Sequence, residues 1–284
     1  MGWYKLDISK PIIICGSGAS IPFLNSRYNY NGFKHGLELK LEQIIKSNYS
    51  IGLNYWFQFG CETTFNMSGD WQFYLDNSSQ LKKVPMIIAS EDSSLKNKNI
   101  SHIHDNTILL PHSSKYFGIN SWVKNNKGKM NSFYSRQLIG MFSLTLAIAL
   151  GFKEIYLLGY DCCEINGQTH FYQGVVDLND HRDIYVDGKL KDRRYKFKGV
   201  GKKPKGDYET STYNHVNHIN KKWYAPYEIE TKKIKIYNVS PNSVINIFPK
   251  ISYDTFFKQI DNNNINQNKA RQEIKDFVIE KLKN

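Results

Sequence analysis

The feature that most restricts the fold of this chain is a long apolar helix that is followed directly by a buried strand. The predicted helix spans residues 135–151, and side chains such as Phe142 and Leu146 leave it little polar surface. A helix that is apolar nearly all round lies inside a fold, and Gly151 suits the position just after its last turn. Residues 153–161 then predict a strand that ends in Gly-Tyr-Asp.

Further segments predict strands of the same buried kind. The clearest is 11–15, a β-branched run that ends in the glycine turn Gly16-Ser17-Gly18. Other strand candidates are 49–54, 63–66, 84–89, 108–110 and 233–240, and helices are predicted at 37–50 and in the tail 262–284. Helices and strands that alternate in this way predict an α/β fold, a Rossmann-like parallel sheet with helices on both faces.

The character of the sequence changes between residues 162 and 224. Helical and strand periodicity disappear there, while Gly, Asp, Lys, Arg, Tyr and His accumulate. Long irregular stretches between core elements are usually lids or binding loops. We therefore expect three parts: a nucleotide-binding core over 1–161, an irregular basic lid insertion on the acceptor side over 162–224, and a return to the core with a C-terminal helix over 225–284.

Much of the positive charge lies in that insertion. The chain has a formal net charge of +12, and residues 181–205 hold ten Lys or Arg against three Asp. A basic chain favours anionic partners, namely nucleotides, nucleic acid, phospholipid or acidic glycans. Because the charge is local, we interpret it as the way in which the lid meets an anionic or glycan acceptor or holds a leaving phosphate. Nucleic-acid binding through 181–205 and a merely solvated loop remain open.

Composition also bounds the compartment. The four cysteines form no C-x-x-C pair, which is typical of free thiols in a reducing cytoplasm. No apolar run approaches the roughly 18 residues that cross a bilayer, and the first residues lack a signal-peptide pattern. We expect a cytoplasmic protein, with peripheral contact at the inner membrane face left open. The excess of Asn, Lys, Ile and Tyr indicates an AT-rich source, phage or bacterial.

The glycine turn and two asparagines predict a nucleotide site. Backbone N–H groups at Gly16, Ser17 and Gly18 can bind phosphate, although such a turn alone is often only a strand-to-helix connection. Asn54 and Asn66 each end a predicted strand, and in parallel sheets ligands bind just outside the carboxyl ends of the strands. A single asparagine there more often caps a turn, so the prediction depends on all three features sharing one edge.

Two histidines of the insertion are candidates for a general base. His215 and His218 are three residues apart and would share one face of a helix. No Cys, Asp or Glu stands near them at metal-ligand spacing, so we expect no metal. Because histidine titrates near neutral pH, either one suits proton transfer. A solvated loop histidine is the alternative.

Phenols and a guanidinium would complete such a site. Tyr172, Tyr208 and Tyr213 lie in the insertion, and Arg136 stands at the head of the apolar helix. Together with nearby lysines they would suit holding a leaving phosphate or diphosphate without metal. The alternative is aromatic packing of the lid on the core.

Four blocks of the chain together resemble the bacterial sialyltransferases of glycosyltransferase family 42 and their MptE-like relatives. The closest block is 147–161, Ala-Ile-Ala-Leu-Gly-Phe-Lys-Glu-Ile-Tyr-Leu-Leu-Gly-Tyr-Asp. Residues 12–20 resemble the first strand and G-N-G-P-S-L turn of that family, and 237–243 resembles its C-P-N-S turn. Asn54 and Asn66 stand where the family has its two strand-end asparagines.

The resemblance implies a Rossmann-like core of the GT-A-variant kind and a glycosyltransferase that inverts the anomeric carbon with a His base. It also implies a CMP-linked sugar as donor, no metal or other cofactor, and a homo-oligomer, since family members often form tetramers. Arg136 matches an active-site Arg, and His215 or His218 falls about where the catalytic His stands. The implied nucleotide-binding residues are Gly16, Ser17, Gly18, Asn54, Asn66, Asp161, Asn242 and Ser243.

The sequence departs from the family pattern at several of these places. Ser17 replaces the Asn of G-N-G, and Ile139 stands where the family has a substrate-contacting Ser. The two phosphate-binding tyrosines of the family lid align nearest Cys163 and His170. We therefore expect His170, Tyr172 and Tyr213 around the leaving phosphate, and a nucleotide-activated donor whose sugar is not fixed.

These observations lead to one main hypothesis and two alternatives. The main hypothesis is a glycosyltransferase that moves a sugar from a nucleotide donor, a CMP-sugar before others, to an acceptor hydroxyl. The first alternative is ATP-dependent pyrophosphoryl transfer, as in MptE-like proteins. This reaction requires Mg²⁺ and carboxylate ligands, for which Asp161 and Glu164 are the candidates. The second is a nucleic-acid-directed glycosyltransferase or binding protein.

Overall fold

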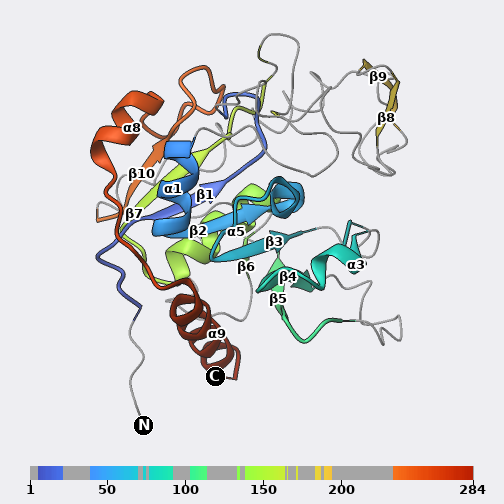
Figure 1. Cartoon of the computed structure of the whole chain (residues 1–284), viewed down its shortest axis with the longest axis vertical. Helices are drawn as coiled ribbons and strands as arrows, with labels where there is room; N and C mark the ends of the chain where they lie inside the picture. Colours follow the sequence, from blue (N-terminus) through green and yellow to red (C-terminus); the bar gives the residue numbers. More distant parts are fainter. Residues whose placement is uncertain are drawn as a thin grey trace.

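A computed structural model of the chain gives the arrangement shown in Figure 1. It describes residues 6–21, 39–69, 73–74, 77–91, 103–113, 133–134, 138–163, 165, 171, 183–186, 189–193 and 233–283. Within these residues the strands form one large sheet and one small one. The helices lie against the large sheet (Figure 1).

The large sheet has eight strands in the order β10-β7-β1-β2-β3-β4-β5-β6 among the described residues. Its strands are β1 (Ile12–Cys15), β2 (Tyr49–Leu53), β3 (Phe65–Ser68), β4 (Ile87–Glu91), β5 (Thr107–Ser113), β6 (Phe133–Tyr134), β7 (Glu154–Leu158) and β10 (Lys235–Asn238). Every neighbouring pair is parallel. Parallel sheets are covered on both faces, so their strands read as apolar runs. This is the Rossmann-like α/β fold that the sequence predicts.

Helices cover both faces of this sheet. Ile12 and Ile14 of β1 point into a core shared with α5 (Ile139–Ala149) and α9 (Gln267–Lys283). Ile13 and Cys15 point into a second core, shared with α1 (Leu39–Ser47), α8 (Tyr253–Gln259) and the 3₁₀ helix η2 (Asn54–Phe59). Because successive strand side chains alternate between faces, one apolar run supports two cores.

Helix α5 is the apolar helix predicted from the sequence. Seven consecutive residues, 141–147, are buried, so the helix has no polar face toward solvent there. It ends before Gly151, whose φ of 95° lies in the left-handed region that glycine adopts freely. The described helix begins at Ile139, and the head of the predicted helix at 135–137, which includes Arg136, lies outside the described residues.

Several elements differ from the prediction. Strand β3 begins and ends two residues later than expected, so Asn66 lies inside it and not at its end. Thr64 is β-branched and so resembles a strand residue. Its hydroxyl accepts from the Ser50 amide and its amide donates to the Ser50 hydroxyl, so it makes side-chain bonds in place of strand pairing, and β3 begins after it. The short elements η2, α3 (Ser78–Leu81), β6 and α8 were not predicted, because few residues give too little periodicity.

Part of the insertion is also more regular than predicted. Strands β8 (Asp183–Val186) and β9 (Lys189–Arg193) form an antiparallel pair in which Val186 is opposite Lys189. The prediction of an irregular stretch is therefore wrong at these residues. The sequence signal was Asp187-Gly188, a dipeptide that favours a two-residue hairpin turn. Most of the remaining insertion lies outside the described residues.

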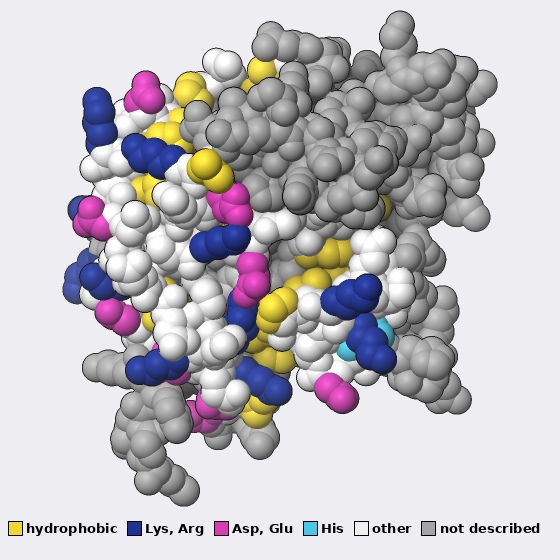
Figure 2. Space-filling view, in the orientation of Figure 1, with side chains coloured by type: hydrophobic (Ala, Val, Ile, Leu, Met, Phe, Trp, Pro, Cys, Tyr) yellow, Lys and Arg dark blue, Asp and Glu magenta, His cyan; other side chains and the backbone are white. Residues whose placement is uncertain are grey.

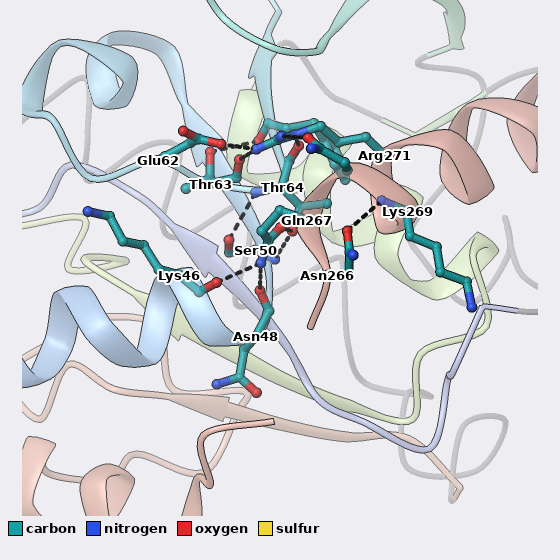
Figure 3. A network of polar contacts seen from close by, with 12 residues as sticks. Lys46, Asn48, Ser50, Glu62, Thr63, Thr64, Asn266, Gln267, Lys269 and Arg271 are labelled. Atoms are coloured by element: carbon teal, nitrogen blue, oxygen red, sulfur yellow. Dashed lines mark hydrogen bonds and ion pairs between the residues drawn. The ribbon is translucent and has the colours of Figure 1, made fainter. Parts of the chain in front are cut away.

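A polar network joins α9 to the amino ends of β2 and β3 (Figure 3). Arg271 donates to the carbonyl oxygens of Thr64 at 2.8 Å and Thr63 at 3.2 Å, and pairs with the Glu62 carboxylate. Gln267 donates to the carbonyl oxygens of Lys46 and Asn48 at 2.8 and 2.9 Å. These carbonyl groups lie at the ends of a helix and of strands, where the element itself provides no partner for them. Because Arg271 and Gln267 provide the missing donors, the bonds fix the C-terminal helix to the sheet.

The surface of the described part is mixed in charge. Figure 2 shows Lys and Arg interspersed with Asp and Glu over the face it presents, with small apolar areas between them. Leu39 and Ile103 are the large hydrophobic side chains exposed among the described residues. Within these residues, no helix combines the length and the apolar character that crossing a membrane requires.

Candidate functional site

The sheet has a topological switch point between β1 and β7. From β1 the chain proceeds through β2 to β6 on one side, and it then returns by α5 to place β7 on the other side of β1. In open parallel sheets, ligands bind in the crevice outside the carboxyl ends of the strands at such a point. The turn after β1 and the turn after β7 are therefore the centre of the candidate site.

The two turns are in direct backbone contact. The amide of Gly16 donates to Leu158 O at 2.8 Å, and the amide of Gly18 donates to Gly159 O at 2.9 Å. A Cβ added to Gly18 would lie 2.5 Å from Gly159 O, which no real side chain tolerates. The glycines are thus required by the approach of the two turns to each other, in addition to any role toward a ligand.

This contact changes which amides are available to an anion. The N–H groups of Gly16 and Gly18, two of those predicted to face phosphate, are already bonded to β7 and its turn. The amides of Ser17 and Ala19 have no hydrogen-bond partner among the residues that the structure describes. Ser17 and Ala19 are partly exposed. Any phosphate contact at this turn would therefore not use the amides of Gly16 and Gly18.

Asp161 lies beneath the glycine turn and is 1% exposed. Its Oδ2 accepts from the amide of Ser20 at 2.7 Å, and its Oδ1 accepts from the Ser20 hydroxyl at 2.5 Å. The Ser20 hydroxyl is also 2.8 Å from that of Ser240. The carboxylate predicted to bind the nucleotide is therefore engaged with the protein itself, and it links the turns that follow β1, β7 and β10.

The buried charge of Asp161 acts on its neighbours. Burial, and then the nearby Asp161 charge, raise the pKa of the Cys162 thiol to about 12. The same two causes, in the same order, raise the pKa of the Tyr253 phenol well above its usual value. Both groups stay protonated at neutral pH. Cys162 has a φ of 52°, so the backbone turns sharply just after Asp161.

The turn after β10 packs against the turn after β7. The hydroxyl of Ser243 donates to Tyr160 O at 2.7 Å and accepts from the amide of Ile245 at 3.0 Å. Asn238 also donates to Tyr160 O, at 3.3 Å. Ser243, predicted to bind the nucleotide, is 3% exposed and its hydroxyl serves this turn. Asn242, predicted beside it, is exposed at the surface.

The structure brings the two predicted asparagines together. Asn54 follows β2 directly, with a left-handed φ of 49°, and its side chain is partly exposed. Asn66 is 1% exposed, and its Nδ2 donates to Asn54 O at 3.0 Å. The order of strands places both near the glycine turn, since β2 lies next to β1. Asn54 is the more exposed of the two.

Aromatic side chains cover this edge beside the asparagines. Trp56 and Phe59 of η2 pack against Phe171, with ring centroids 5.6 and 4.7 Å apart. The amide of Phe171 donates to Ser17 O at 3.1 Å. Phe171 belongs to the insertion, so the insertion is anchored on the glycine turn near its start. Tyr172, Tyr208 and Tyr213, for which packing on the core was the alternative, lie outside the described residues.

The predicted catalytic residues lie outside the described part of the chain. These are Arg136, His215 and His218, together with the leaving-phosphate candidates His170, Tyr172 and Tyr213. Among the residues that are described, no three or more His, Cys, Asp or Glu side chains group as metal ligands do. Asp161 is the one carboxylate at the centre of the site among these residues, and its hydrogen bonds go to Ser20.

Sequence reasoning missed four residues of the site. Ser20 and Ser240 stand within blocks that it used, but Ser20 bonds to Asp161 and to Ser240, which are both far away in the sequence, so no local pattern reveals these bonds. Trp56 and Phe171 could have been noticed as aromatic residues next to predicted site positions. Their contact depends on how the insertion crosses the sheet edge, which periodicity does not indicate.

Comparisons with known proteins add one likeness. No protein-family model matches the chain, and no curated protein matches it. Among solved structures, the chain is similar to the sialyltransferase CstII from Campylobacter jejuni, determined in complex with a substrate analogue, cytidine-5'-monophosphate. The alignment covers 84% of each chain at 16% identity, with a TM-score of 0.31. A similarity at this level does not by itself define a shared activity.

Proposed function

We propose that this protein is a glycosyltransferase that binds a nucleotide-activated sugar, a CMP-sugar before other donors, at the carboxyl edge of β1, β2 and β7. The observation that carries the proposal is the switch point, where two glycine turns meet with the partly exposed Ser17 and Asn54 beside them. Switch points of this kind are where open α/β sheets bind nucleotides. The resemblance of the same segments to glycosyltransferase family 42 supports the donor class.

The binding part of the proposal assigns roles by chemistry. The amides of Ser17 and Ala19 are donors suited to a phosphate oxygen, and the amide side chain of Asn54 can both donate and accept, as a ribose or pyrimidine edge requires. The Asp161 carboxylate would repel a phosphate placed beside it. It therefore supports the site from beneath by holding Ser20, while the phosphate lies on the Ser17 side of the turn.

The catalytic part of the proposal comes from the sequence. His215 or His218 takes the proton of the acceptor hydroxyl, whose oxygen forms the new bond to the anomeric carbon as the bond to the nucleotide phosphate breaks. Attack from the opposite side inverts that carbon. Arg136, with His170, Tyr172 or Tyr213, stabilises the leaving phosphate without metal. The insertion would provide the acceptor side, where its basic residues suit an anionic or glycan acceptor.

Two experiments test this function. Calorimetry with CMP, CDP, UDP, GDP and ATP identifies the donor class, and we expect CMP to bind most tightly; binding of none of them would contradict the proposal. Transfer or hydrolysis of CMP-sugars is then followed with EDTA and with Mg²⁺. The variants His215→Ala and His218→Ala, compared under the same conditions, should differ strongly, because only one removes the base.

The same experiments separate the alternatives. Activity that needs Mg²⁺ and ATP would indicate pyrophosphoryl transfer in place of glycosyl transfer. Binding to DNA or RNA that weakens steeply with salt would indicate a nucleic-acid partner for the basic insertion. Sedimentation analysis gives the oligomeric state, for which we propose a homo-oligomer on the basis of the family resemblance.

A further inference from the structure

Two buried polar atoms without a partner lie near the carboxyl end of β2, one on η2 and one on β3, where Asn66 is opposite Gly52. The indole Nε1 of Trp56 and the amide Oδ1 of Asn66 have no hydrogen-bond partner within the described part of the chain. Both side chains are 1% exposed, so neither atom is in contact with bulk water. An unpaired buried donor or acceptor destabilises a fold by about 1–3 kcal/mol. Such atoms are rare and indicate a missing partner.

The two atoms border the same point of the sheet. A Cβ added to Gly52 would lie 2.6 Å from Asn66 Oδ1 and 2.7 Å from Trp56 Cδ1, the ring carbon bonded to Nε1. The bond from Asn66 Nδ2 to Asn54 O fixes the amide, so that its oxygen is directed away from Asn54. Only glycine fits at position 52, and its lack of a side chain lets the Trp56 ring and the Asn66 amide oxygen approach the same point of the sheet.

The chemistry of the pair restricts what can satisfy it. The indole N–H only donates, and the amide oxygen only accepts. A phosphate oxygen would accept from Trp56 but leave Asn66 Oδ1 unpaired, and an ammonium group would do the reverse. A hydroxyl group accepts and donates at once, so a single hydroxyl satisfies both atoms.

We propose that Trp56 and Asn66 form a hydroxyl-binding subsite, which takes one hydroxyl of a ribose or of another polyhydroxylated ligand. Trp56 is then a specificity-determining residue, because its N–H rejects ligands that lack this hydroxyl. The ring of Phe171 packs on Trp56, with ring centroids 5.6 Å apart, and supports the indole in this position. The location of the ligand rests on the proposed function, whereas the donor–acceptor pair is a property of the fold.

Nuclear magnetic resonance of the tryptophan side chains tests the subsite directly. The chain has five Trp residues, and the variant Trp56→Phe assigns the Trp56 indole N–H signal in ¹⁵N-labelled full-length protein. We titrate CMP, its 2',3'-dideoxy analogue and methyl β-D-ribofuranoside. The expected result is a shift of the Trp56 signal with CMP and with the riboside, and no such shift with the dideoxy analogue.

Affinities measured by calorimetry complete the test. Trp56→Phe keeps an aromatic ring against Phe171 but removes the donor, so it should weaken CMP binding about tenfold and leave the dideoxy analogue unaffected. The matched control is Tyr49→Phe, at the opposite end of β2, which removes a hydroxyl that accepts from the Asp7 amide. It should change neither affinity.

The outcomes separate this subsite from the proposed function. CMP binding with an unmoved Trp56 signal, or equal weakening of both nucleotides by Trp56→Phe, overturns the subsite and leaves nucleotide binding intact. A Trp56 signal that moves with the riboside while no nucleotide binds supports the subsite and contradicts the proposed function. A signal that moves with none of the three ligands overturns the subsite.

Discussion

Ser20 holds Asp161 by two hydrogen bonds, one from its amide at 2.7 Å and one from its hydroxyl at 2.5 Å. The two residues are 141 positions apart in the sequence. A buried carboxylate is stable only when donors surround it, and Ser20 provides both of those bonds. The pair therefore joins the turn after β1 to the turn after β7, and the shape of the candidate site depends on it.

Replacing this carboxylate should weaken the site and the fold together. In Asp161→Asn, only one side-chain oxygen remains to accept from Ser20, so the second bond can form only with the Ser20 hydroxyl as acceptor, and both bonds lose the strength that the charge gives them. We expect the free energy of unfolding to fall by about 1–3 kcal/mol, as measured by urea denaturation, with weaker nucleotide binding. Asp261→Asn, at an exposed side chain, is the control and should leave both quantities unchanged. Unaltered stability of Asp161→Asn would show that the Ser20 bonds do not support the turn.

The contact between the glycine turns predicts a strong effect of a single methyl group. In Gly18→Ala the new Cβ would lie 2.4 Å from Asp161 Oδ2 and 2.5 Å from Gly159 O, so the turns have to separate. Overpacking of this kind costs about 1–3 kcal/mol, and we expect a lower melting temperature. Gly69→Ala meets Ile139 Cδ1 at 3.3 Å, the end of a flexible side chain, and should be tolerated. Equal melting temperatures of the two variants would contradict the tight contact.

The network at the amino ends of β2 and β3 should matter for stability but not for ligand binding. Arg271→Ala leaves the carbonyl oxygens of Thr63 and Thr64 without these bonds, so we expect a loss of about 1–3 kcal/mol. Nucleotide affinity should be unchanged, since the candidate site lies at the opposite ends of the strands. Gln272→Ala, at an exposed residue of the same helix, should change stability by less than about 0.5 kcal/mol. A large loss of affinity in Arg271→Ala would place the ligand elsewhere.

The raised pKa of Cys162 predicts how stability depends on alkaline pH. The folded thiol keeps its proton up to about pH 12, whereas an unfolded cysteine loses it near its ordinary pKa. Above that ordinary value the folded state therefore binds more protons than the unfolded state, and stability falls as pH rises. This contribution is fully present at neutral pH and disappears through the folded pKa.

The variant Cys162→Ser tests this dependence. Urea denaturation between pH 7.5 and 10.5 should show a shallower alkaline loss in the variant, by up to about 1.4 kcal/mol per pH unit for one proton. Burial raises the pKa of Cys61 in the same direction, so the variant should retain some of the slope. Identical slopes in the two proteins would show that the Cys162 thiol ionises in the folded state as it does in the unfolded one.

The sequence predicts the centre of this fold well, because buried parallel strands and the helix between them are apolar throughout. Strands β1, β2 and β7 and helices α5 and α9 lie where periodicity places them. The predicted strand boundary is wrong where a polar, β-branched residue resembles a strand residue. Thr64 lies just before β3, and its hydroxyl accepts from the Ser50 amide. The prediction also fails in the insertion, where β8 and β9 alternate too briefly to stand out.

The site is predicted in location but not in detail. That Gly16, Asn54 and Asp161 approach one edge follows from their positions after strands of a parallel sheet. That the Gly16 amide and the Asp161 carboxylate are used within the protein depends on contacts between distant segments, which no local pattern encodes. The catalytic predictions His215, His218 and Arg136 remain predictions, and the variants His215→Ala and His218→Ala test the two histidines.

The pairing of β1 with β7 has a consequence for when, during synthesis, the edge of the sheet that carries the candidate site can form. Ile12 of the first strand is opposite Ile155, so one of its two neighbours is made only after more than half of the protein has been synthesised. Contacts between such distant segments slow folding, because a long loop has to close first. During synthesis the glycine turn therefore exists without the turn that shapes it, and a nascent chain that stops before β7 would lack one half of the candidate site.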